Sequence, residues 1–158
     1  MKRIKFRTYT GILAILLLTI GCTSNTPKEV EHVFAKGQLA PSQLFTGNVY
    51  VTGLIDNDSV FTTAGGEVFF EADARSNWHS HPAGQILVVT AGVGYHQIKG
   101  HPIEVIHKGD VVKCPPNVDH WHGASKDASM SHIYIVPNTE KGIVEWKEPV
   151  TDEEYSNL

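Results

Sequence analysis

Two histidines one residue apart, His79 and His81, lie near the middle of the chain, with Gln85 four residues later and His120 behind a turn. Side chains at positions i and i+2 of a β-strand point to the same face, so the two imidazoles can bind one ion together. With Gln85 and His120 they form a set of three nitrogens and one oxygen, all neutral, which suits a divalent first-row transition metal. This spacing favours a metal centre over a polar cluster satisfied by hydrogen bonds alone.

The donor set does not identify the ion. Imidazole and amide ligands accept Mn, Fe, Co, Ni, Cu or Zn, and the usual affinity order favours the later metals over Mn. Because Gln85 carries no charge, a divalent ion held there would keep its full positive charge and act as a stronger Lewis acid than one bound by a carboxylate.

Two further histidines, His122 and His132, are the candidate catalytic groups. His122 follows His120 by two residues and shares its face if the strand is regular. His132 has the apolar neighbours Met130, Tyr134 and Val136 on its own face. A neutral imidazole with an ordinary pKa near ~6.5 can carry a proton beside a metal-bound substrate. We therefore favour His132 as a general acid or base, with His122 second; the alternative is a buried structural histidine.

Apolar residues on the expected strands form a candidate substrate pocket, although each of them would also suit a barrel core. They are Gly66, Val68, Phe70, Leu87, Met130 and Val136. Trp78 and Trp121 each precede an expected ligand, so strand alternation turns them away from the metal and into packing or a dimer contact. His96, His101 and His107 have no partner at useful spacing and are expected at the surface.

The elements that would position these residues are short strands. β-Branched and apolar runs bounded by turn residues predict strands at 49–52, 66–71, 85–90, 94–99, 103–107, 110–112 and 131–136. Their regular spacing and the near absence of a helical period indicate an all-β sandwich or barrel. Thr151 to Glu154 has the form of a capping box, which predicts a short C-terminal helix. No internal repeat is evident, so we expect one barrel.

The N-terminal residues are expected to be a targeting segment. Basic residues at positions 2–7 precede a short apolar run at 11–20 and then Gly21-Cys22, a pattern that resembles a bacterial lipoprotein signal. Residues 1–21 would be removed, Cys22 lipidated, 22–43 would form a tether and 44–158 the folded domain. An ordinary signal peptide or an uncleaved anchor is the alternative. The mature protein would be exported to the bacterial cell envelope as a membrane-associated lipoprotein, on the periplasmic or the surface face.

Charge and cysteine content narrow the possible partners. Removal of the first 21 residues leaves nine basic against 17 acidic side chains, a net charge near −8. An acidic domain without basic clusters argues against nucleic acid and against electrostatic docking to anionic lipid, so membrane contact would come only from the anchor at Cys22. Cys114 would then be the one remaining cysteine, and its apolar surroundings indicate a packed thiol.

The motifs as a whole resemble those of the cupin superfamily. Its first motif is matched by His79, His81, Gln85 and Gly92, with Gln85 in place of the usual glutamate and Asp73 in place of the first glycine. Its second motif is matched by Gly109, Pro115 or Pro116, Asn117 and His120, with Ala124 in place of the usual asparagine. The resemblance implies a single barrel of the double-stranded β-helix type, with the metal inside near one mouth.

A closer resemblance, from about Leu44 to Tyr155, is to the small bacterial manganese cupins that include hydroxynitrile lyases. It is carried by the blocks WHSHPAGQILVVTAGVG, IHKGDVVKCPP, HWHGASKDASMSHI and VEWKEPVTDEEY. It implies Mn as the metal, with Fe, Ni, Co or Zn as alternatives, bound by three histidines and one glutamine. It also implies that a cyanohydrin is cleaved to an aldehyde and cyanide, with His132 handling a proton. The cyanohydrin-cleaving members carry Gln where this chain has Val136, so the pocket mouth is expected to be more apolar, and the resemblance leaves open whether the native substrate is the same.

Two other functions remain open from the sequence. The same ligands could serve a cupin dioxygenase that uses Fe or Mn. The lipoprotein signal would also suit a non-catalytic, lipid-anchored protein that binds small ligands. The family resemblance further implies a homo-oligomer, a dimer or tetramer, and a small-molecule substrate.

Overall fold

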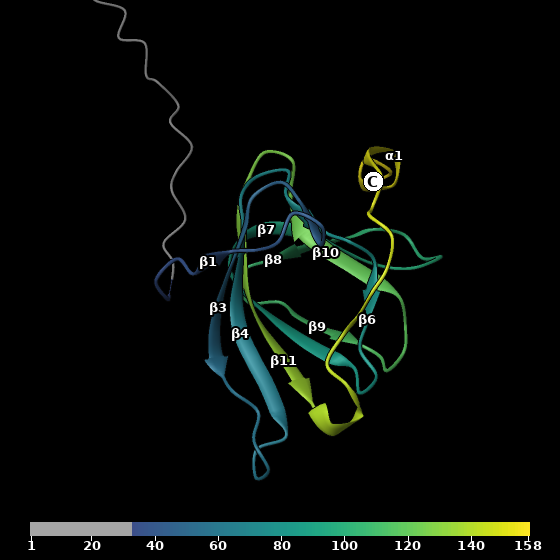
Figure 1. Ribbon diagram of the computed structural model, residues 1–158. Helices are drawn as coiled ribbons and strands as arrows, with labels where there is room; N and C mark the ends of the chain where they lie inside the picture. The colour runs from purple at the N-terminus through teal and green to yellow at the C-terminus, as the bar shows by residue number, and fades with distance from the viewer. Residues whose placement is uncertain (1–32) are drawn as a thin grey trace, which may run out of the picture.

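The computed structural model describes residues 33–158, which form one β-barrel made of two curled antiparallel sheets (Figure 1). The predicted all-β fold with a single short C-terminal α-helix is confirmed. The predicted signal peptide, residues 1–21, and Cys22 lie outside the described residues. Within the described part of the chain, no helix is long and apolar enough to span a membrane.

The first sheet runs in the order β1-β3-β4-β11-β7-β9, and its strands are all antiparallel. They are β1 (Gln38–Leu39), β3 (Val49–Ile55), β4 (Thr63–Phe70), β11 (Met130–Pro137), the first part of β7 (Gln85–Ile98) and β9 (Val111–Cys114). The β-branched and aromatic residues of β3 and β4 alternate toward the barrel interior, which places Val49, Val68 and Phe70 in the core.

The second sheet contains the strands that carry His79 and His120, two of the candidate metal ligands. It is built from β12 (Glu145–Trp146), β6 (His79–Ser80), β10 (His120–Ala124), the second part of β7 and β8 (Glu104–His107), with β5 (Arg75–Ser76) and β2 (Phe45–Thr46) beyond. In this sheet His120 lies directly opposite His79, on the paired strands β10 and β6. A 3₁₀ turn, η1 (Thr139–Lys141), follows β11 and leads to β12.

One long strand, β7, belongs to both sheets. The sequence predicts separate strands at 85–90 and 94–99, but the chain continues unbroken from Gln85 to Ile98. Its early part pairs with β11 and β9, and its later part with β10 and β8. The change of partners occurs at Gly92, whose φ of 74° is left-handed and where a Cβ would lie 1.9 Å from the carbonyl oxygen of Ser129. Only glycine tolerates this bend, which turns the strand without ending it.

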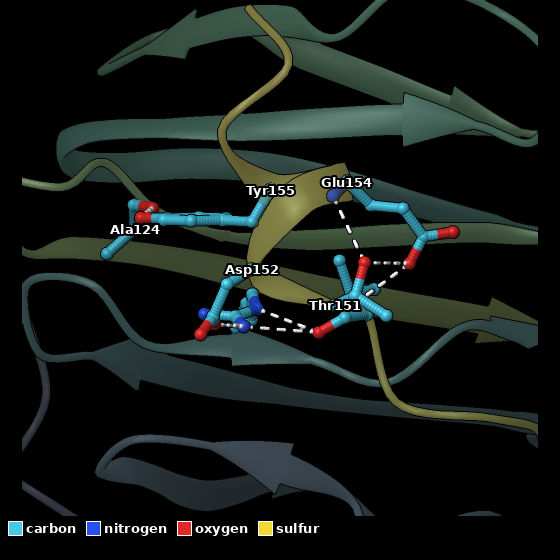
Figure 2. A network of polar contacts seen from close by, with 7 residues as sticks. Ala124, Thr151, Asp152, Glu154 and Tyr155 are labelled. Carbon is cyan, nitrogen blue, oxygen red and sulfur yellow. Dashed lines mark hydrogen bonds and ion pairs between the residues drawn. The ribbon is translucent and has the colours of Figure 1, made fainter.

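The helix α1 (Asp152–Tyr155) packs on the outside of the second sheet. Its predicted capping box is present: the Thr151 hydroxyl accepts from the Glu154 N–H, and the Glu154 carboxylate accepts from the Thr151 N–H (Figure 2). Val150 and Tyr155 are buried in an aromatic cluster outside the main core, together with Trp78, Tyr95 and Trp121. The expectation that Trp78 and Trp121 turn into packing is therefore confirmed.

The barrel begins earlier in the chain than residue 44. Strand β1 lies within the segment that the sequence assigns to the tether, and it pairs with β3. Lys36 forms an ion pair with Glu71, and a Cβ on Gly37 would lie 2.0 Å from the carbonyl oxygen of Val51. These contacts place the stretch from residue 36 onward against the barrel.

Candidate metal centre

Three of the four expected ligands converge in the barrel interior. His79 and His81 come from β6 and the turn that follows it, and His120 begins β10. Each of them can offer one ring nitrogen, and these nitrogens lie within 4.8 Å of one another. All three residues are buried. The pairing of β10 with β6 brings His120 into place, although it lies 41 residues beyond His79 in the sequence.

Backbone carbonyls fix the proton on each of these rings. The Nδ1–H of His79 donates to Asn77 O at 2.9 Å, and that of His120 donates to Val118 O at 2.9 Å. The Nδ1–H of His81 donates to the carbonyl of Ile143. A carbonyl only accepts hydrogen bonds, so Nδ1 must carry the proton and Nε2 presents a lone pair.

Gln85, at the start of β7, completes the set. Its Oε1 lies 3.4 Å from Nε2 of His120, and both of these atoms present lone pairs once the His120 proton is on Nδ1. The Nε2 of His81 is buried and has no hydrogen-bond partner in the described stretch from residue 33 to 158. Lone pairs that converge without a donor between them are satisfied by a cation. The residues therefore fit a divalent metal bound through three imidazole nitrogens and one amide oxygen.

Burial keeps these imidazoles neutral. Desolvation is the main cause that lowers the pKa of His79 well below its usual value. It is also the main cause that lowers the pKa of His120 to about 4. Desolvation also lowers the pKa of His81, opposed by its bond to Ile143. Neutral imidazole is the form that binds a metal, so the site is ready for one at neutral pH.

His122 and His132 stand beside this centre. Their ring centroids are 4.7 Å apart, and the ring of His122 lies 5.1 Å from that of His79. Burial lowers the pKa of His122 well below its usual value and lowers the pKa of His132 to about 4. Within the described part of the chain, neither ring nitrogen of His132 has a hydrogen-bond partner, and the same holds for Nδ1 of His122. Both rings line the pocket described next.

An apolar pocket of about 380 Å³ leads to the candidate ligands. Of the residues expected in its wall, Val68, Phe70 and Val136 line it. Gly66, Leu87 and Met130 do not; Leu87 and Met130 are fully buried and pack within the hydrophobic core instead. The pocket is lined by Gln38, Leu39, Ala40, Pro41, Phe45, Val51, Val68, Phe70, Ser76, His79, His81, Gln85, His122, His132, Tyr134, Val136, Ile143, Val144 and Trp146.

Several of these wall residues were not foreseen. Phe45 and Trp146 form an edge-to-face pair with ring centroids 5.4 Å apart, and Trp146 also packs 5.0 Å from the His79 ring. The sequence offers one indication of their role. Phe45 and Trp146 are large aromatic residues outside the expected strands, and such side chains are usually buried against other apolar groups. Gln38 to Pro41 also border the pocket, so the N-terminal stretch forms part of its rim.

The expectation that His96 lies at the surface is wrong. The residue is only 2% exposed, its Nε2 lies 3.5 Å from Sγ of Cys114, and its Nδ1 lies 3.7 Å from a Glu104 carboxylate oxygen. Both partners come from strands that flank β7, which sequence spacing does not show. His101 and His107 are exposed, as expected. Cys114 is buried as expected, and burial raises the pKa of its thiol to about 12.

Comparison with known proteins agrees with this geometry. Residues 66–136 match a family model described as a cupin domain. An (R)-mandelonitrile lyase from Granulicella tundricola is 44% identical over 115 residues, which are 73% of this chain and 88% of that protein. The crystal structure of a cupin-like protein from Thermotoga maritima has 48% identity and a TM-score of 0.77, covering 79% of this chain and 95% of that one. A DMSP lyase from Ruegeria pomeroyi, at 20% identity and a TM-score of 0.56 over 69% of this chain and 54% of that one, shares the fold alone.

Proposed function

This chain belongs to the cupin family, and on that basis we propose that it is a metal-dependent lyase that cleaves the C–CN bond of a small cyanohydrin to an aldehyde and cyanide. The observation that carries the proposal is the convergence of three neutral imidazoles and the Gln85 amide beside an apolar pocket. The 44% identity to an (R)-mandelonitrile lyase supports this reaction class. The proposed ion is Mn²⁺, although the same donors would also hold Fe, Co, Ni or Zn.

A divalent metal in this site would supply Lewis acidity toward an oxygen atom of the substrate. The chain supplies the other requirements. The apolar wall holds the organic part of the substrate and keeps water out. We assign the proton of the substrate hydroxyl to His132, which lines the pocket and whose two ring nitrogens have no hydrogen-bond partner among residues 33–158. His122, 4.7 Å away, is the second candidate to receive that proton or to pass one to cyanide.

The apolar mouth of the pocket supports a substrate with an apolar or aromatic body. Val136 is 1% exposed and lines the pocket, together with Phe70 and Trp146. Val136 offers no hydrogen bond, so a polar group at that end of the substrate would lose its hydration without compensation. We therefore propose that the native substrate carries no polar group opposite Val136.

The test is a turnover assay on metal-loaded protein. Mn²⁺-loaded protein, mixed with mandelonitrile and with aliphatic cyanohydrins, is expected to release aldehyde and cyanide in equal amounts without consuming oxygen. Oxygen uptake with an enediol or flavonol substrate would instead support the dioxygenase alternative. Tight ligand binding without any turnover would support the binding-protein alternative. Absence of aldehyde release with every cyanohydrin and every reconstituted metal would reject the lyase.

We also propose that the mature protein is tethered to the cell envelope through lipid on Cys22 and that it forms a homo-oligomer, a dimer or tetramer. The support for the anchor is the order of the basic, apolar and Gly-Cys segments at the N-terminus. A Cys22→Ser variant is expected to leave the membrane fraction and to lack acylation by mass spectrometry. Light scattering on the domain measures the oligomeric state.

A further inference from the structure

The three imidazoles differ in the origin of the carbonyl that accepts their Nδ1–H proton. For His79 and His120 the acceptor is the carbonyl two residues earlier in the same stretch of chain. For His81 it is the carbonyl of Ile143, 62 residues away. Such an acceptor fixes the tautomer and the ring orientation of a liganding histidine. The orientation of His81 therefore depends on the C-terminal segment, defined here as residues 142–155, which contains no candidate ligand.

The C-terminal segment also holds the strand that carries the HxH pair. In β12, Trp146 lies opposite His79, with the ring centroids 5.0 Å apart. The pairing continues beyond β12: Trp78 N–H donates to Glu148 O at 3.0 Å, and Lys147 N–H donates to Trp78 O at 2.9 Å. Strand β6 is only two residues long and lies between β10 and β12. Among the described strands, β10 pairs with one edge of β6 and β12 of the C-terminal segment pairs with the other; Figure 1 shows the yellow C-terminal stretch running beside β6.

The far end of the C-terminal segment is fixed to the barrel by polar contacts. The Arg75 guanidinium donates to Val150 O at 3.2 and 3.1 Å and forms an ion pair with Asp152. The Tyr155 hydroxyl donates to Ala124 O at 2.9 Å (Figure 2). Arg75 is nearly fully buried, so loss of its carbonyl acceptor would leave a buried cation without part of its hydrogen bonding. The segment is thus held at both ends.

We propose that the C-terminal segment is a positioning element of the metal centre. Its docking holds His79 and His81 with their lone pairs toward the common point, and binding of a divalent ion at that point strengthens the docking in return. Thermodynamic linkage requires this reciprocity. The free energy by which docking of the segment strengthens metal binding equals the free energy by which metal binding strengthens docking. The inference rests on the proposed metal site and not on the proposed reaction.

A single glycine gives a way to disturb this element without touching a ligand. Gly142 precedes Ile143 and has φ 110° and ψ 156°, a conformation that side-chain-bearing residues rarely adopt; a Cβ there would lie 3.1 Å from Cγ of Pro82. Gly142→Ala should therefore shift the Ile143 carbonyl. Gly100→Ala is the matched control, since Gly100 has φ 85° and open space where its Cβ would be, in the turn between β7 and β8.

The measurement is the dissociation constant for Mn²⁺, and separately for Zn²⁺, by calorimetric titration of the apo-protein. Gly142→Ala is expected to bind each ion about 10- to 100-fold more weakly than the unaltered protein, the usual effect of losing a group that orients a ligand. Gly100→Ala is expected to keep the original affinity. Equal affinities for the two variants would overturn the positioning role. Failure of the unaltered protein to bind either ion would instead reject the proposed metal site.

A second measurement needs no variant and covers the case in which Gly142→Ala does not fold. Hydrogen exchange of the unaltered protein, followed by mass spectrometry, compares peptides from the C-terminal segment with and without Zn²⁺. Slower exchange in this segment on adding Zn²⁺ is expected, with no change in the turn at residues 99–103. Unchanged exchange in the C-terminal segment of a protein that has bound Zn²⁺ would overturn the coupling.

Discussion

The ring centroids of His122 and His132 lie 4.7 Å apart with the ring planes inclined by 59°, and the Phe70 ring packs against both at 5.8 and 5.7 Å. Both imidazoles are buried, yet three of their four ring nitrogens have no hydrogen-bond partner among the residues that the structure describes. Buried polar atoms in this state cost free energy that a bound ligand can recover. This pair therefore adds polar groups to the pocket wall beside the candidate ligands, and a substrate's hydroxyl or nitrile group is expected to bind there.

The first prediction concerns His132→Gln, which keeps a polar side chain of similar length but removes the ring that can carry a proton. We expect kcat for cyanohydrin cleavage to fall about 10²- to 10⁴-fold, the usual loss for a general acid or base. Metal content should be unchanged, because His132 is not a candidate ligand. His107→Gln, at an exposed histidine, serves as the control. Turnover equal to that of the unaltered protein would show that His132 carries no proton.

The second prediction concerns the metal. His120→Ala removes one of three converging imidazoles and the partner of the Gln85 amide, so we expect elemental analysis to show loss of the bound ion. Added Zn²⁺ should raise the melting temperature of the unaltered protein but not that of the variant. His101→Ala is the matched control at an exposed site and should retain the ion. Full metal content in His120→Ala would contradict the assigned ligand set.

Substrate choice gives the third prediction. Val136→Gln introduces an amide into the apolar wall, at the position where the family resemblance implies Gln in cyanohydrin-cleaving cupins. We expect kcat/KM to shift by roughly 10-fold or more toward cyanohydrins with a polar group, because the amide can pair with a group that Val136 leaves unpaired. The same change at Val60, which is 78% exposed, should leave kcat/KM unaltered. An unchanged substrate ranking in Val136→Gln would remove this residue from the determinants of specificity.

The fourth prediction is a loss of stability of the apo-protein in acid. Burial lowers the pKa of His120 and of His132 to about 4, whereas both titrate near ~6.5 once unfolded. Between these values the unfolded chain binds protons that the folded chain does not. The free energy of unfolding should therefore be constant above about pH 6.5 and fall as the pH drops toward 4. Urea titrations across this pH range measure the free energy of unfolding. In His132→Gln this free energy should depend less steeply on pH. A free energy of unfolding that increases as the pH falls would contradict the burial argument.

Much of the candidate metal centre could be predicted because its ligands lie in short motifs. Two histidines and a glutamine within seven residues need only a strand and a turn to come together. The burial of His96 could not be read in this way. Its partners, Cys114 and Glu104, are brought to it by β9 and β8, which pair with the early and the later part of β7. The spacing of these residues along the chain does not reveal contacts that arise only through strand pairing.

The role of the C-terminal segment was also hidden, for a different reason. The group that orients His81 is the backbone carbonyl of Ile143, and every residue type offers a backbone carbonyl. Side-chain patterns therefore give no sign of it.

The wall of the pocket was predicted only in part. Strand alternation shows which residues face inward but not how far along the barrel the cavity extends. Leu87 and Met130 do face inward, but they lie where the barrel is filled.

The bend of β7 at Gly92 has a consequence for the order of folding. Gln85, the first residue of the strand, places its amide against His120, while Ile98, the last, pairs with the backbone of the same residue. Laid out straight, the strand would separate its two ends by roughly 40 Å. Both ends reach His120 only after the strand has turned and both sheets have formed around it. The complete set of four donors is therefore assembled late in folding. An ion bound to all four would stabilise the closed barrel, and it would lower the rate of unfolding more than it raises the rate of folding.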